Sequence, residues 1–118
     1  MIADYDGQSH AGQLKPIDLG LQVEGVHSQA ISSTRCERAI FVFDFLNATP
    51  SANIRVEGYI NGIWFVCEEQ TVSGDGGHAI FVDCRGFEGL RGLLVSTQGE
   101  PAAGTTQVHL TAMMVKMN

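Results

Sequence analysis

The chain has 118 residues, of which 44% are hydrophobic and 17% are charged, and its formal net charge is −6. This composition predicts one ordered globular domain with a substantial core and excludes a disordered chain. The 7 basic residues are scattered, which argues against nucleic acid and an anionic membrane as partners, because phosphate binding needs clustered Lys and Arg.

Residues 1–16 are polar, contain glycine, show no periodicity and end in Lys15-Pro16. They predict an extended N-terminal arm preceding a single domain over residues 17–118. Such an arm is either a frayed terminus or a segment that orders on a neighbouring subunit, with Ile2 and Tyr5 as its anchors. The first residues lack a basic segment followed by an apolar one, so we expect synthesis in the cytoplasm without Sec export.

The next two segments alternate polar and apolar residues, as strands do. The first predicts a half-buried strand with apolar positions Leu19, Leu21 and Val23. The second, residues 37–46, is apolar at almost every position and predicts a central strand buried on most of both faces, with Asp44 as the exception. Its two apolar sets are Phe41, Phe43 and Phe45 on one face, and Ile40, Val42 and Leu46 on the other.

The dipeptide Asn61-Gly62 lies between two runs rich in β-branched and aromatic residues. It predicts a hairpin with a two-residue type I′ turn, since both turn residues need positive φ. Counting outward then pairs Tyr59 with Trp64 and Arg55 with Glu68. The predicted inner, core-facing set is Ile54, Val56, Ile60, Ile63, Phe65 and Cys67. The predicted outer set is Arg55, Glu57, Tyr59, Trp64, Val66 and Glu68.

Glycine-rich turns at 73–77 and 86–89 and a loop at 99–104 separate three further strand patterns. The last of these, residues 105–116, places four apolar residues on one face: Val108, Leu110, Ala112 and Met114. About seven or eight short strands without helical periodicity predict an all-β fold, an antiparallel β-sandwich of jelly-roll type.

Residue patterns for catalysis or metal binding are weak. The four histidines are widely separated and form no ligand pair, and the glycines around Asp75 precede a strand rather than a helix. No serine has a nucleophile-elbow context. Glu57 and Glu68 share a hairpin face with Arg55, which favours an ion pair over a pair of catalytic carboxylates. We therefore expect no enzyme activity, no metal and no cofactor.

The cysteines Cys36, Cys67 and Cys84 are odd in number and lie in or beside apolar strand patterns. A secreted disulfide scaffold normally has an even number. The pattern favours three buried, reduced side chains, with a Cys67–Cys84 pair as the alternative if their strands are neighbours.

On the outer hairpin face, Tyr59, Trp64 and Val66 form an apolar patch. Such a patch is a subunit interface, a surface covered by another segment of the same chain, or a platform on which a sugar stacks.

Four segments follow one another in a recognisable order: Ile54-Arg-Val-Glu-Gly-Tyr-Ile-Asn-Gly-Ile-Trp-Phe65, the strand from Ala79 to Asp83, residues 87–96, and the final Thr- and Val-rich strand. This order resembles that of small β-sandwich virion proteins of tailed bacteriophages. The resemblance covers the C-terminal two-thirds and is strongest with capsid decoration (cement) proteins. It implies a non-enzymatic virion component, assembled in the host cytoplasm, that clamps capsid or other virion proteins, commonly as a trimer or another homo-oligomer.

Two functions follow as expectations. The first is a structural assembly protein whose interface is Tyr59, Trp64 and Val66, with the arm around Ile2 and Tyr5 as a second contact. The alternative is a carbohydrate-binding module or tail-fibre-like adhesin. In that case Tyr59 and Trp64 stack on a sugar ring of a glycan, and its hydroxyls bind Arg55, Glu57 and Glu68.

Overall fold

The computed structural model describes residues 2–3 and 16–116. Tyr5 and the rest of the predicted arm between these ranges lie outside the described residues. The described residues form nine strands: β1 (Ile2–Ala3), β2 (Pro16–Leu21), β3 (Ala30–Ser32), β4 (Cys36–Leu46), β5 (Ser51–Ile60), β6 (Ile63–Val72), β7 (Gly76–Asp83), β8 (Gly89–Gln98) and β9 (Gln107–Lys116).

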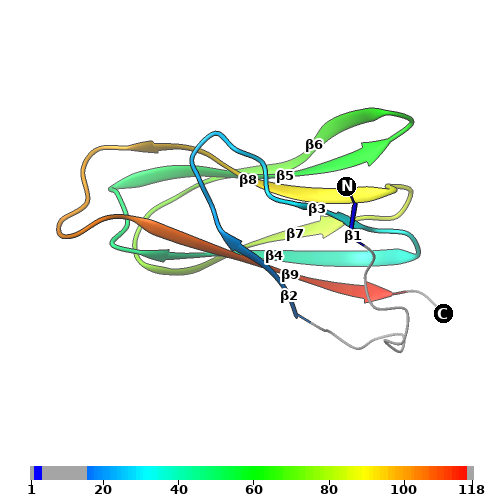
Figure 1. The fold of residues 1–118 in the computed structure, drawn as a ribbon, viewed down its shortest axis with the longest axis horizontal. Coiled ribbons are helices and arrows are strands. Elements are labelled where there is room, and N and C mark those ends of the chain that lie inside the picture. The colour runs from blue at the N-terminus through cyan, green and yellow to red at the C-terminus, as the bar shows by residue number, and fades with distance from the viewer. Residues whose placement is uncertain (1, 4–15, 117–118) are drawn as a thin grey trace.

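The strands form two facing sheets, one of five strands in the order β1-β3-β8-β5-β6 and one of four in the order β2-β9-β4-β7 (Figure 1). Strands β2 to β9 pair as the two arms of one long hairpin would: β2 with β9, β3 with β8, β4 with β7, and β5 with β6. The strands of each arm alternate between the sheets, which is the jelly-roll arrangement. The predicted antiparallel sandwich is confirmed, with a parallel β1–β3 pair added at one edge.

The core lies between the sheets and contains the alternating residues that the sequence pattern selects. Phe41, Phe43 and Phe45 of β4 are buried, and so are the four predicted apolar residues of β9. The central position predicted for residues 37–46 is also confirmed, since β4 lies between β9 and β7. These residues fix the relative placement of the two sheets.

The prediction that this strand is buried on both faces is wrong. Ile40 and Val42 are only half-buried, and Leu46 is 55% exposed. The reason is architectural: the sandwich has two layers, so a central strand is covered on its inner face alone.

The half-buried alternation predicted for the first strand fails at its end. A register shift between Asp18 and Gly20 interrupts the pairing of β2 with β9. An extra residue of this kind reverses which side chains face inward. Leu21 and Val23 are therefore exposed, at 62% and 63%, whereas Ile17 and Leu19 pack against the core.

The prediction of three reduced cysteines is also wrong. Cys36 and Cys84 form a disulfide, and Cys67 is the free cysteine of the three. Both bonded residues are buried, and they join the start of β4 to the residue directly after the neighbouring β7. The alternative Cys67–Cys84 pair is wrong as well, because Cys84 is bonded to Cys36 and the strands that carry or precede the two residues, β6 and β7, are not neighbours.

Candidate functional site: the β5–β6 hairpin

The turn of the β5–β6 hairpin has the predicted geometry. Asn61 and Gly62 have φ values of 51° and 79°, as a type I′ turn requires. The pairs nearest the turn are also confirmed: Ile60 faces Ile63, Tyr59 faces Trp64, and Gly58 faces Phe65. The local sequence therefore sets the end of the hairpin without help from the rest of the chain.

Farther from the turn the predicted register is wrong. A shift between Val56 and Glu57 leaves Cys67 as an extra residue on β6, so that Val56 faces Glu68 and Arg55 faces Glu69. This β-bulge moves each later residue of β6 by one position. Glu68 consequently lies on the face opposite to Arg55, and its neighbour Glu69 is the residue that pairs with Arg55.

A network of charged side chains covers the outer face of the five-stranded sheet, and Glu57 is its centre. Arg91 Nε donates to Glu57 Oε1 at 2.8 Å, and Arg55 Nη1 donates to Glu57 Oε2 at 3.2 Å. Arg55 Nε also donates to Glu69 Oε1 at 2.7 Å, and His27 Nε2 lies 3.2 Å from Glu57 Oε1. Glu57, with only 6% exposure, is thus held by Arg55 of its own strand, by Arg91 of β8 and by His27 of the β2–β3 connection.

The electrostatics of the network keep Glu57 ionised. Its burial opposes the charged form, but the hydrogen bonds from Arg91 and Arg55 outweigh burial and hold the pKa of Glu57 below its ordinary value. The pKa of Arg55 is raised, mainly by its hydrogen bond to Glu69. A carboxylate held by two arginines is a poor general acid or base, so the network is a structural brace.

Two aromatic residues extend the brace towards the turn. The rings of Tyr59 and Trp64 are 5.0 Å apart at an angle of 52°, and the guanidinium of Arg91 lies 4.0 Å from the centre of the Trp64 ring. This cation–π contact occupies one face of the indole. Arg91 thus connects the aromatic pair to Glu57.

The hairpin exposes apolar side chains near its tip, where it projects from the sandwich (Figure 1). Ile63 is 56% exposed, Phe65 47% and Val66 55%. The prediction that Ile63 and Phe65 belong to the core is wrong, and Ile60 and Cys67 are only half-buried. The alternation of side chains along the strand correctly predicts that Ile63 and Phe65 lie on the inner face of the hairpin. However, β6 is the edge strand of its sheet, so this face is only partly covered by the other sheet.

The inner face of β5 is fully used for packing up to Gly58. A Cβ atom at Gly58 would lie 2.5 Å from the ring of Phe87, so no larger residue fits without moving that ring. Phe87 therefore closes the core beneath the hairpin, and Phe65, opposite Gly58, lies beyond it.

Five of the eight residues predicted for the interface gather on one face: Arg55, Glu57, Tyr59, Trp64 and Val66. The sequence pattern did not indicate Arg91 and His27, because Arg91 comes from β8 and His27 from the β2–β3 connection, which are distant from the hairpin in the sequence. Glu68 is exposed on the other face. Ile2 pairs through its backbone with Ala30 on β3, and Tyr5 is not among the described residues.

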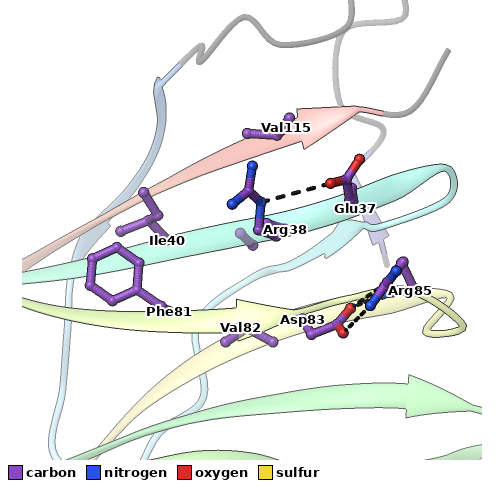
Figure 2. A pocket seen from close by; sticks show the side chains of 9 residues that line it. Glu37, Arg38, Ile40, Phe81, Val82, Asp83, Arg85 and Val115 are labelled. Carbon is purple, nitrogen blue, oxygen red and sulfur yellow. Dashed lines mark hydrogen bonds and ion pairs between the residues drawn. The ribbon is translucent and has the colours of Figure 1, made fainter.

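A second surface feature lies on the outer face of the four-stranded sheet. It is an open depression of about 550 Å³ between apolar residues (Ile40, Phe81 and Val115) and charged ones. Figure 2 shows the charged side chains paired, Asp83 with Arg85 and Glu37 with Arg38. The hydrogen bonds from Arg85 lower the pKa of Asp83 to about 2.

Among the described residues, no group of three or more His, Cys, Asp or Glu side chains is arranged to hold a metal ion. The same residues include no helix long and apolar enough to span a membrane.

No family model matches the sequence, and no curated protein matches it either. One solved structure is similar: the SPBc2 prophage-derived protein YomS, with a TM-score of 0.60 and 10% sequence identity, over 88% of this chain and 94% of that one. At this identity the match establishes a shared fold over nearly the whole of both chains.

Proposed function

We propose that this chain is a non-enzymatic structural protein of a phage virion, in the manner of a capsid decoration or cement protein, and that it binds its neighbour through the β5–β6 hairpin. The observation that carries the proposal is the exposure of Ile63, Phe65 and Val66 at the tip of a braced hairpin. Ile63 and Phe65 lie on the inner face of β6 and Val66 lies on its outer face. Large apolar side chains exposed on one projecting strand are typical of a contact element.

The brace supports this role because it fixes the shape of the binding element. Arg55 joins Glu57 to Glu69 across the two strands of the hairpin, and Arg91 joins Glu57 to the neighbouring β8. A hairpin that is rigid before binding loses little conformational entropy on contact, so more of the apolar burial appears as affinity.

Two observations support the proposal that this chain is a phage protein. The motif order of the sequence resembles phage decoration proteins, and the fold is similar to that of a prophage-derived protein, YomS. A virion location and capsid or other virion partners follow from the same proposal.

A glycan-binding module is the second candidate, because Tyr59 and Trp64 lie together on the outer face. Sugar stacking needs an open aromatic face, however, and Arg91 already covers one face of Trp64. Arg55 and Glu57 are likewise engaged with each other. This arrangement favours the structural role over the glycan.

The test is binding to particles of the encoding phage that were assembled without this protein. We expect the wild-type chain to co-sediment with the particles and the double variant Ile63→Ser/Phe65→Ser to lose most of this binding. Val23→Ser is the matched control, since Val23 is equally exposed on another segment. Equal binding by all three proteins would refute the hairpin contact. Binding to a glycan array that Trp64→Ala abolishes, without particle binding, would favour the second candidate.

A further inference from the structure

The outer face of the four-stranded sheet is apolar in its middle. Phe81 is 69% exposed, the highest value among the exposed large hydrophobic residues. Beside it, Ile40, Val42 and Met113 are half-buried. No described element of the chain lies over this face, since the other sheet packs on its inner side. A contiguous apolar surface of this kind marks a contact site.

Along β4, the charges at the two ends of this face have opposite signs, whereas Asp18 on β2 and His109 on β9 are paired with each other. Along the central strand β4, the outward residues run from Arg38 through Ile40 and Val42 to Asp44. Arg38 is well exposed, and its ion pair with Glu37 is long, at 3.9 Å. Its strand neighbour Asp83 is engaged by Arg85 (Figure 2). The middle of the stripe is apolar, and each end offers a charge to a partner.

The rows across the sheet alternate in size. Ile40 is flanked by Phe81 on β7 and Met113 on β9, whereas Val42 is flanked by Ala79 and Thr111. One row therefore carries large side chains and the next row carries small ones.

We propose that two copies of this chain pair back to back through this face, related by a twofold axis that runs across the strands. The rotation reverses β4 on β4, so that Arg38 meets Asp44 of the second copy and Ile40 meets Val42. It also places Phe81 over Ala79 of the second copy. Each contact occurs twice, as a twofold interface requires, and both charge and size are complementary.

The alternative twofold axis, parallel to the strands, is disfavoured. It would place Arg38 against Arg38 and Asp44 against Asp44, and like charges at an interface are costly. The charge pattern of β4 thus favours a second copy of the chain as the binding partner of this face, and it also favours one orientation of that copy.

The size of the face suits a modest dimer. Four strands and the seven residues from 38 to 44 span about 19 Å by about 23 Å, or roughly 900 Å² of flat area for two copies. Real side chains add to this area, so it approaches roughly 1,000 Å², the lower bound for a specific interface. This contact goes beyond the proposed function, which uses the other sheet, and leaves both hairpins of the dimer free.

The test uses light scattering on the purified chain over a range of concentrations. We expect a wild-type dimer, whereas Arg38→Asp and Asp44→Arg each raise the dissociation constant at least about tenfold, because an attraction becomes a repulsion at two places. Mixing the two variants should restore a dimer, because one chain then carries arginine at both positions and the other carries aspartate at both. The double variant should dimerise by itself.

Circular dichroism and thermal unfolding of each variant are the controls for folding, since both side chains are exposed. A monomeric wild-type chain at its solubility limit, a trimer, or a dimer that neither reversal weakens would overturn the proposal. The trimer implied by the family resemblance is therefore distinguished directly. Because the hairpin is unchanged, particle binding by Arg38→Asp tests the proposed function separately.

Discussion

The two outer faces of this sandwich differ in which side chains cover them and in what stabilises the sheet beneath. The outer face of the five-stranded sheet is closed by ion pairs around Glu57, with arginine covering tryptophan. The outer face of the four-stranded sheet leaves Phe81 and its neighbours uncovered, and a buried disulfide joins two of its strands. One sheet is thus braced by charge and the other by a covalent bond, and only the second presents a broad apolar face.

The largest expected effect comes from breaking the covalent brace. Cys36 and Cys84 are 48 residues apart, and closing a loop of that size contributes about 4 kcal/mol in the chain-entropy model. We expect Cys36→Ser/Cys84→Ser to lower the free energy of unfolding by about this amount, measured by urea denaturation. Cys67→Ser, at the free cysteine, is the control and should change little.

Breaking the ionic brace should cost less. Glu57→Gln removes the charge that two arginines share, which leaves the partly buried Arg91 without its carboxylate and Arg55 with Glu69 alone. We expect a loss of about 2 kcal/mol, below the value for a fully buried pair because both arginines retain some exposure. Glu68→Gln, on the exposed side of the same hairpin, should stay within about 0.5 kcal/mol. Equal effects of the two substitutions would contradict the brace.

Acid titration tests the same brace. Because the folded-state pKa of Glu57 lies below its unfolded value, its contribution is fully present above the unfolded pKa of about 4.3 and is lost as the pH falls through the lower folded pKa. Urea unfolding at neutral pH and at about pH 3 should show a smaller acid loss in Glu57→Gln than in the wild type. Identical pH dependence in both proteins would rule out this linkage.

The smallest effect on stability is expected on the uncovered face. Phe81→Ser removes a large side chain that contacts little of the core, so the free energy of unfolding should change by no more than about 0.5 kcal/mol. Phe41→Ala, on the buried face of the adjacent β4, should cost about 3–5 kcal/mol. Thermal unfolding of both variants, at concentrations low enough for the chain to be monomeric, decides this. A large loss in Phe81→Ser under that condition would show that the face is already covered within one chain.

Much of the fold could be predicted from residue patterns. The Asn61-Gly62 turn and the Tyr59–Trp64 pair follow from short-range geometry, and the core residues of β4 and β9 follow from alternation. The candidate site was found in part, because five of its residues lie on one hairpin. Arg91 and His27 had no local signal, since their approach to Glu57 depends on how distant strands pair.

Local sequence dictates the turn, the strands and the two-faced alternation, because these depend on φ preferences and on a period of two residues. Which faces are covered depends instead on tertiary structure. The bulge at Cys67 makes Glu69, and not Glu68, the partner of Arg55. The edge position of β6 leaves Ile63 and Phe65 exposed. The pairing of β4 with β7 brings Cys36 next to Cys84. In each case the outcome depends on neighbours far away in the chain, which alternation does not encode.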